Sequence, residues 1–442
     1  MNLEFRIRIN KVQIKQKHTL VPSLFLKNHK MSLFSNLLRF LKRVGINLLI
    51  ISLIVGVANV LPIPRWRTGV IFMSVAGLVL AQWHLYVKVR IVDPWLKEER
   101  RLGRLVKWTH LSYAVLSCAA PVLAKFFMGA LVSAALICFL SNMWLLCLIT
   151  LLNGVHALIS TACGKRTPWT AKQESAFIVF SVLAFTAAAY YEASLEYQVN
   201  RVDVQLPGLS RELTITHLSD LHLGSVLGLD FCHRVLATVK RLDSDLVVIT
   251  GDLFDISYHH LPESIPGCVA LMGRVFYVTG NHEYFTSTVE EWLDALSSSG
   301  VVVLQNDCAC VDGLIDVVGI NDLTAHRYSD SHAADVAKAV ASCPSSSPPL
   351  PRLFLAHQPN HVAAIAAYSA NSPTLVLSGH THGGQVFPAT LLVHLANLYV
   401  EGHARHDDDV QVIVSRGTGQ WGPKLRLGSR AEIIQIVVHP QI

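Results

Sequence analysis

Charged residues are scarce in this sequence. Asp, Glu, Lys and Arg together make up 15% of its 442 residues, whereas about 25% is usual in soluble domains. The mean hydropathy is +0.40, and the formal net charge is +6. The length exceeds that of one typical domain. The shortage of charge indicates that part of the chain consists of membrane segments.

Several other signals are absent. No Gly-x-Ser-x-Gly elbow surrounds Ser219, which argues against a serine nucleophile. No Asn-x-Ser/Thr site helps to place the chain relative to a membrane. Five cysteines of the C-terminal half could pair in a lumenal domain, but their number is odd and none has zinc-knuckle spacing, so we predict no particular disulfide. These are Cys232, Cys268, Cys308, Cys310 and Cys343.

Apolar runs dominate the chain from residue 44 to residue 192, the predicted transmembrane domain. Five of them approach the roughly 20 apolar residues that cross a bilayer. They are 44–61, 69–86, 109–124, 127–152 and 175–191. The alternative for each run is a buried core helix, and this alternative carries most weight for 175–191.

The distribution of Lys and Arg predicts the orientation of these spans. Residues 1–43, the loop 87–108 and the loop 153–173 carry twenty Lys and Arg, whereas the opposite loops carry three. Because basic loops stay cytoplasmic, residues 1–43 are predicted to be cytosolic, although a targeting peptide is the alternative. Five spans then place the C-terminal domain on the extracytoplasmic or lumenal side. Without the fifth span, this domain would be cytosolic.

Short strands, polar turns and amphipathic helices follow the apolar half. We predict a linker over 193–210, which contains turn residues, and a catalytic domain over 211–442. Helices are predicted over 228–242, 289–299 and 332–341. The alternation of strands and helices is typical of an α/β domain.

Five apolar strands of this domain each end in a polar turn with metal-ligand residue types. Because sites in α/β sheets gather beyond the carboxyl ends of strands, we expect the five turns to meet. Carboxylate, imidazole and amide ligands suit Mn, Fe or Zn better than Ca. Each turn alone is a weak signal, but the ordered set is specific. The turns carry Asp220 and His222; Asp252 and Asp255; Asn281, His282 and Glu283; His357; and His380 and His382.

The ordered motifs Asp-x-His, Gly-Asp-x-x-Asp, Gly-Asn-His-Glu, His and Gly-His-x-His resemble the calcineurin-like metallophosphoesterase superfamily, over about residues 211–440. This resemblance implies a four-layer α/β/β/α sandwich that binds two divalent cations (Mn, Fe or Zn). In this chain the sandwich would follow a multi-pass α-helical membrane domain. The implied ligands are Asp220, His222 and His382 for one ion; Asn281, His357 and His380 for the other; and Asp252 bridging both. His282 would be the general acid or stabilise the leaving oxygen, and Asp255 and Glu283 would orient ligands by hydrogen bonds.

The implied reaction is hydrolysis of a phosphomonoester, phosphodiester or pyrophosphate by a hydroxide that bridges two metals. The membrane anchor favours a lipid-linked phosphate as substrate, and a soluble nucleotide stays open. Arg416 and Arg426 are candidate substrate-binding residues, with a plain surface position as the alternative for each. We expect a lipid bilayer and no nucleic acid as partners, while the oligomeric state is open.

Two other functions are consistent with the sequence. The first is a membrane receptor or scaffold whose metal domain is structural, against which the intact ligand set and His282 count. The second is a transporter, for which the support is thin because the spans contain few ionisable residues, His84 and His110 among them.

Overall fold

The computed structural model describes residues 169–224, 226–260, 264–285, 288–369 and 372–441, together with Trp144, Leu151, Leu152, Val155 and Ile159. The predicted cytosolic segment and the first three predicted spans lie outside the described residues, as does most of the fourth. The chain divides into two compact units, of which one contains Met1–Val122 and Leu146–Ile178 and the other contains Leu123–Leu145 and Val179–Ile442.

Helix α6 (Ala171–Ser194) contains the fifth predicted span. With 24 residues it extends about 36 Å at 1.5 Å per residue, enough for a hydrocarbon core about 30 Å thick. Its segment Lys172–Ser194 has a mean hydropathy of 1.6, and in the described residues it is the one helix long and apolar enough to cross a membrane. This evidence rests on length and composition alone.

The first of two six-stranded sheets has the order β1-β12-β2-β3-β4-β5. All neighbours are parallel except β12 and β2, which are antiparallel. The strands are β1 (Gln198–Leu206), β2 (Leu213–Leu218), β3 (Leu246–Thr250), β4 (Val275–Val278), β5 (Val302–Val303) and β12 (Glu432–Pro440).

The second sheet has the order β10-β11-β9-β8-β7-β6. Its outer pairs β10–β11 and β6–β7 are antiparallel, and the inner pairs are parallel. The strands are β6 (Asp307–Val311), β7 (Ile315–Ile320), β8 (Arg352–Ala356), β9 (Thr374–Ser378), β10 (Gly402–Arg405) and β11 (Val410–Val414).

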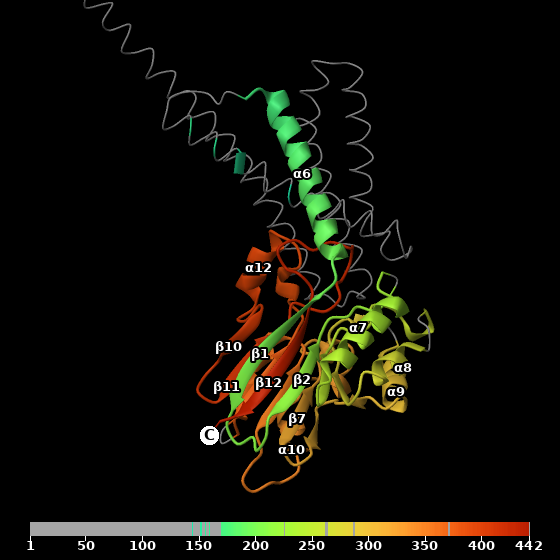
Figure 1. Cartoon of the computed structure of the whole chain (residues 1–442), viewed down its shortest axis with the longest axis vertical. Helices are drawn as coiled ribbons and strands as arrows, with labels where there is room; N and C mark the ends of the chain where they lie inside the picture. Colours follow the sequence, from blue (N-terminus) through green and yellow to red (C-terminus); the bar gives the residue numbers. More distant parts are fainter. Residues whose placement is uncertain are drawn as a thin grey trace, which may run out of the picture. The chain divides into compact units, whose positions relative to one another are not determined.

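The two sheets pack face to face, and helices cover their outer faces. Ile215 and Val248 of the first sheet share one apolar cluster with Leu377 of the second. On the outer face of the first sheet lie α7, α8 and α9, which Figure 1 places together on one side of the strands. The outer face of the second sheet packs against α10 and α11. β3 and β9 are buried along their whole length, as expected for strands covered on both faces.

The described α-helices after α6 are α7 (Leu229–Leu242), α8 (Ser264–Ala270), α9 (Val289–Ser298), α10 (Val336–Ala341), α11 (Val362–Ala366) and α12 (Ala389–Ala396). The short 3-10 helices are Tyr258–His260, Glu283–Phe285, Ala325–Arg327, Asp330–His332, Pro359–His361 and His382–Gly384. The predicted α/β sandwich is confirmed, whereas the multi-pass membrane domain stays a prediction.

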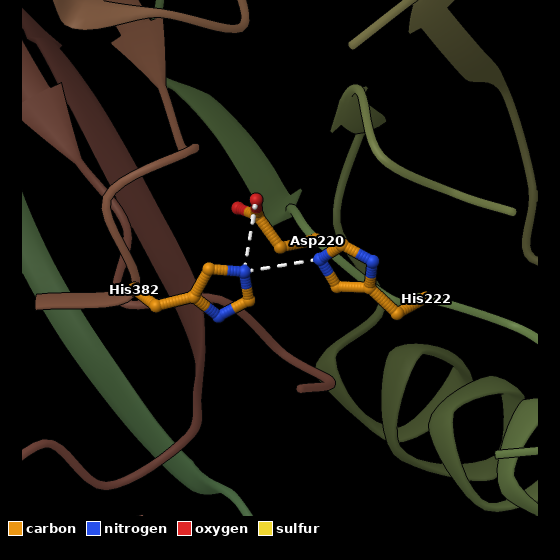
Figure 2. A group of neighbouring side chains, drawn as sticks. All are labelled: Asp220, His222 and His382. Atoms are coloured by element: carbon orange, nitrogen blue, oxygen red, sulfur yellow. Dashed lines mark hydrogen bonds and ion pairs between the residues drawn. The ribbon is translucent and has the colours of Figure 1, made fainter. Parts of the chain in front are cut away.

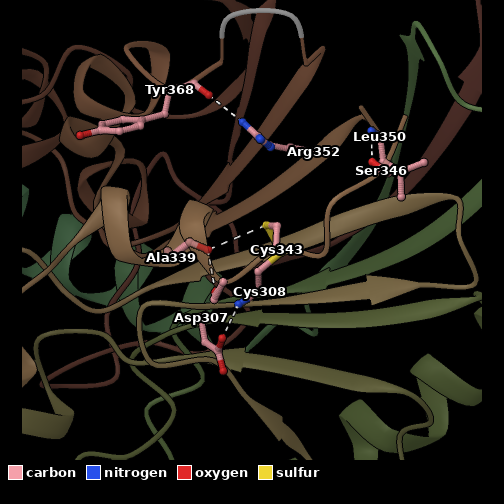
Figure 3. Close-up of a disulfide and its surroundings, with 9 residues drawn as sticks. Asp307, Cys308, Ala339, Cys343, Ser346, Leu350, Arg352 and Tyr368 are labelled. Carbon is pink, nitrogen blue, oxygen red and sulfur yellow. Dashed lines mark hydrogen bonds between the residues drawn. A yellow bond between two sulfur atoms is a disulfide. The ribbon is translucent and has the colours of Figure 1, made fainter. Parts of the chain in front are cut away.

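Three local predictions differ from the structure. Residues 198–206, predicted as linker, form β1 and pair with β12 along nine residues, so they are part of the sheet. The helix predicted over 332–341 begins only at Val336, because Asp335 caps it by accepting a hydrogen bond from the Lys338 amide at 2.9 Å. A disulfide, which the cysteine spacing did not predict, joins Cys308 of β6 to Cys343 just after α10 (Figure 3).

Candidate metal centre

The five ligand-bearing turns lie together at the carboxyl ends of β2, β3, β4, β8 and β9. Backbone hydrogen bonds connect them: the Asp220 amide donates to the Gly251 carbonyl at 3.1 Å, and the Gly379 amide donates to the His357 carbonyl at 2.9 Å. The two sheets therefore contribute to one site, at the strand ends where ligands gather in α/β folds.

A first group of side chains contains Asp220, His222 and His382, all of them buried. Figure 2 shows that one ring nitrogen of His382 faces both the Asp220 carboxylate and the His222 imidazole. Its Nε2 lies 3.0 Å from Nε2 of His222 and 3.4 Å from Oδ1 of Asp220. These are three of the residues predicted to share one ion.

A second group contains Asp252, His357 and His380. Nε2 of His357 lies 3.3 Å from Oδ2 of Asp252 and 3.2 Å from Nδ1 of His380. The amide oxygen of Asn281 also lies 3.2 Å from the same Nε2. Oδ2 of Asp252 is 3.8 Å from Nε2 of His222, so this carboxylate reaches the first group as well.

The donor set fits divalent cations in both type and spacing. Two ligands at 2.0–2.2 Å from one ion, at tetrahedral or octahedral angles, stand about 3.0–3.5 Å apart, and the separations within each group are 3.0–3.4 Å. Nδ1 of His357 donates to the Thr250 carbonyl at 2.7 Å, so in the neutral ring the Nε2 lone pair faces the group. Nδ1 of His222 contacts Oδ1 of Asp255 at 2.6 Å, so Nε2 of His222 likewise faces its group.

The backbone is strained at five of the candidate ligand positions. Left-handed φ angles, unusual for residues other than glycine, occur at Asp220 (54°), His222 (48°), Asp252 (51°), His380 (70°) and His382 (50°). Such strain gathers at functional sites because the surrounding fold must hold it.

Two glycines permit the close approach of these turns. A Cβ at position 280 would lie 2.2 Å from Oδ1 of Asp252, and one at position 379 would lie 2.2 Å from Oδ2 of Asp220. Neither turn could keep its path with a larger residue, so both glycines are needed for the geometry of the carboxylates.

Two buried or half-buried carboxylates support the ligands. Oδ1 of Asp255 lies 2.6 Å from Nδ1 of His222 and 2.8 Å from Nδ1 of His282, so it orients both rings. The carboxylate of Glu283 accepts four backbone N–H groups, from residues 252, 253, 254 and 280. It thus joins the Asp252 turn to the Asn281 turn.

Electrostatics differ between the imidazoles of the site. Burial lowers the pKa of His382 well below its usual value, which favours the neutral form that metal binding requires. Burial alone would lower the pKa of His282 too, but the charges of Asp252 and Asp255 outweigh it and raise this pKa to about 9. Burial would raise the pKa of Asp252, yet His357 and His282 hold it well below the ordinary range.

The two candidate substrate arginines have different surroundings. Arg416 forms an ion pair with Glu432 at 2.7 Å. Arg426 is not on the surface: it is 1% exposed, and its Nη atoms donate to backbone carbonyls, including that of Gly419 at 2.6 Å. Its Nη2 also lies 3.2 Å from Nδ1 of His382.

Sequence reasoning missed two contributors to the site. Ser219 donates from Oγ to Oδ2 of Asp220 at 2.5 Å, and Thr250 provides the carbonyl that orients His357. Both residues lie directly at the ends of β2 and β3, so their place at the strand ends was the available signal.

Comparison with known proteins agrees with this geometry. The calcineurin-like phosphoesterase family profile matches residues 213–384, which contain every residue of the two groups. An uncharacterized metallophosphoesterase of Helicobacter pylori is 34% identical over 263 residues, which cover 59% of this chain and 69% of that protein. The chain belongs to the metallophosphoesterase family.

Animal relatives are also similar. A protein of Danio rerio named transmembrane protein with metallophosphoesterase domain is 38% identical over 244 residues, 53% of this chain and 55% of its own length. A protein of the same name from Bos taurus is 36% identical over 275 residues, which cover 59% of this chain and 60% of that protein. Metallophosphoesterases are metal-dependent phosphoester hydrolases that use two divalent metals. Membership of this family therefore confirms the predicted enzyme class and cofactors.

Proposed function

We propose that the C-terminal domain hydrolyses a phosphomonoester, phosphodiester or pyrophosphate at a dinuclear centre. Asp220, His222 and His382 would hold one cation, and Asn281, His357 and His380 the other. The observation that supports this most is the position of Asp252, whose Oδ2 lies 3.3 Å from His357 and 3.8 Å from His222, one ring of each group. A carboxylate placed between two ligand groups can bridge two ions.

When bound, two divalent cations would neutralise the charge of the phosphate and lower the pKa of a bound water. The side chains of the protein would orient the group that donates a proton to the leaving oxygen. Asp255 holds Nδ1 of His282, which leaves Nε2 of this ring to carry the proton that the leaving oxygen needs. The His282 side chain is 22% exposed, whereas those of His222 and His357 are fully buried. The substrate would therefore approach from the side of His282.

The test is metal-dependent hydrolysis of a chromogenic phosphoester by the purified full chain, with Mn, Fe, Zn and Mg supplied separately. Asp252→Asn should remove essentially all turnover and lower the content of bound metal measured by elemental analysis. Asp230→Asn, at an exposed position of α7, is the matched control. An inactive but metal-loaded wild-type chain would instead favour a scaffold with a structural metal domain.

We further propose that the chain is a multi-pass membrane protein and that its substrate is lipid-linked. Helix α6 supports the anchor. The α12 segment supports contact with lipid, because Leu391, Leu392 and Leu395 are 61%, 59% and 85% exposed and such apolar patches mark interaction sites. Val386, which precedes α12, packs in one cluster with Ala189 of α6. The exposed leucines are thus joined to the end of the candidate span.

The catalytic domain is proposed to be extracytoplasmic or lumenal. The basic loops support this side, and so does the bridge between Cys308 and Cys343, because disulfides persist in oxidising compartments. Protease protection of a C-terminal tag in sealed vesicles tests the orientation. Digestion of the tag from the cytosolic side would contradict the five-span topology while leaving the hydrolase proposal intact.

A further inference from the structure

A cavity of about 360 Å³ lies at the end of α6. Its wall consists of residues 192–197 at the end of α6 and just after it, one side of α7 with Arg234, and several residues of the C-terminal segment. These last residues are Thr418, Gly419, Gln420, Lys424, Arg426 and Ala431. None of the residues proposed as metal ligands lines it. The cavity is therefore a second hollow in the catalytic unit, distinct from the proposed substrate approach beside His282.

Two buried donors at this cavity have no partner among the described residues. Nε of Arg426 and Nε2 of Gln420 are both inaccessible and without a hydrogen bond, and the residues are 1% and 5% exposed. A buried donor left unsatisfied costs about 1–3 kcal/mol, so each such group calls for an explanation. Neither atom has accessible surface, so the side-chain cations that a ligand in the cavity can reach are those of Arg234 and Lys424.

The charges around the cavity favour an anion. Arg234, Lys424 and Arg426 line it, against the two carboxylates Glu192 and Glu196. Glu192 is already engaged, since it accepts hydrogen bonds from the amides of residues 428 and 429 at 3.0 and 3.2 Å.

Arg426 also connects the cavity to the metal centre. Its Nη2 donates to the Gly419 carbonyl at 2.6 Å and lies 3.2 Å from Nδ1 of His382. The Gly419 amide in turn donates to the Asp220 carbonyl at 3.0 Å. The side chain of Arg426 therefore lies between the cavity and the first ligand group.

We propose that this cavity binds a phosphate group, and that the headgroup of an anionic phospholipid supplies it. Guanidinium and ammonium groups are the usual partners of phosphate oxygens in proteins. The lipid is favoured over free phosphate because the last residues of α6, the candidate span, form part of the wall. At the end of a membrane-spanning helix, such a site would face the headgroup layer. The site goes beyond the proposed hydrolysis, since it lies outside the dinuclear centre.

The experiment uses the full chain purified in detergent and titrated by calorimetry with three soluble probes. These are dihexanoyl phosphatidic acid, dihexanoyl phosphatidylcholine and inorganic phosphate. The double variant Arg234→Gln/Lys424→Gln removes two cations of the wall, and Lys240→Gln, exposed on α7 and outside the wall, is the matched control. Asp252→Asn separates this site from the metal centre, where inorganic phosphate could also bind.

We expect phosphatidic acid to bind the wild type, Lys240→Gln and Asp252→Asn alike, and the double variant at least about tenfold more weakly, as loss of charge-assisted contacts predicts. Equal binding of inorganic phosphate, with the same dependence on the variants, would support the anion site and identify free phosphate as its ligand. Unchanged affinity in the double variant, or phosphatidylcholine binding as tightly as phosphatidic acid, would overturn the proposal. If the double variant fails to fold by circular dichroism, Lys424→Gln alone replaces it.

Discussion

Replacement of Glu283 by glutamine gives a sharp test of how the site is held together. Oε1 accepts the amides of Leu253 and Phe254 at 2.7 and 3.1 Å, and Oε2 accepts those of Asp252 and Gly280 at 3.1 and 2.7 Å. Glutamine keeps one of these oxygens. The other position becomes an NH₂ group, so two buried backbone N–H groups would face a donor in place of an acceptor.

The expected cost follows from this count. A hydrogen bond to a charged group contributes about 1.5–3 kcal/mol, so two lost bonds should destabilise the domain by about 3–6 kcal/mol. Because domains are stable by only about 5–15 kcal/mol, the effect should be large. The buried Trp292 ring stacks on Phe254 with centroids 3.6 Å apart, so its fluorescence reports on this turn.

The assay is urea unfolding of the full chain in detergent, followed through tryptophan emission. Glu283→Gln should lower the midpoint strongly and abolish metal-dependent hydrolysis, because the Asp252 turn loses its shape. Glu291→Gln, at an exposed position of α9, should change little. A loss of stability below about 1 kcal/mol in Glu283→Gln would refute the claim that the Glu283 side chain joins the two turns.

Three further outcomes are expected. Asp255→Asn weakens the acceptor that two imidazoles share and should lower activity about 10–100-fold at limiting metal, measured by metal titration. Gly280→Ala should lower activity about a hundredfold or more, because its Cβ would lie 2.2 Å from a carboxylate oxygen; Gly267→Ala, whose Cβ meets nothing within 4 Å, should retain activity. Cys308→Ser opens a loop of 35 residues and should cost about 2–4 kcal/mol, seen as a lower urea midpoint.

The ligand turns could be predicted because the information is local. Each ligand lies within a few residues of the end of an apolar strand, as His357 follows β8 and Asp252 follows β3. Parallel strands bring their carboxyl ends to one edge, so the sequence indicated which side chains would meet. It could not give their distances, which depend on the packing of one sheet on the other.

Features that depend on long-range pairing escaped prediction. β1 lies at the edge of its sheet and alternates exposed residues such as Arg201 and Asp203 with Val202 and Val204, which face inward. The turn residues within 193–210 predicted a linker, and nothing in the local sequence indicated the partner β12, which lies more than 200 residues away. The carbonyls around Arg426 come from a separate turn as well, so no local pattern could distinguish this buried arginine from a surface one.

The form of the site favours catalysis over a purely structural metal domain. Structural metal sites are closed by protein ligands, whereas catalytic sites keep an open position. Here the first ligand group is buried, but His282 is partly exposed and is oriented by Asp255, a carboxylate outside both groups. A structural site would gain nothing from holding a partly exposed imidazole in a fixed direction. The left-handed backbone at five candidate ligand positions lowers the stability of the domain. Such strain is typical of active sites, where the reaction requires a fixed arrangement of side chains.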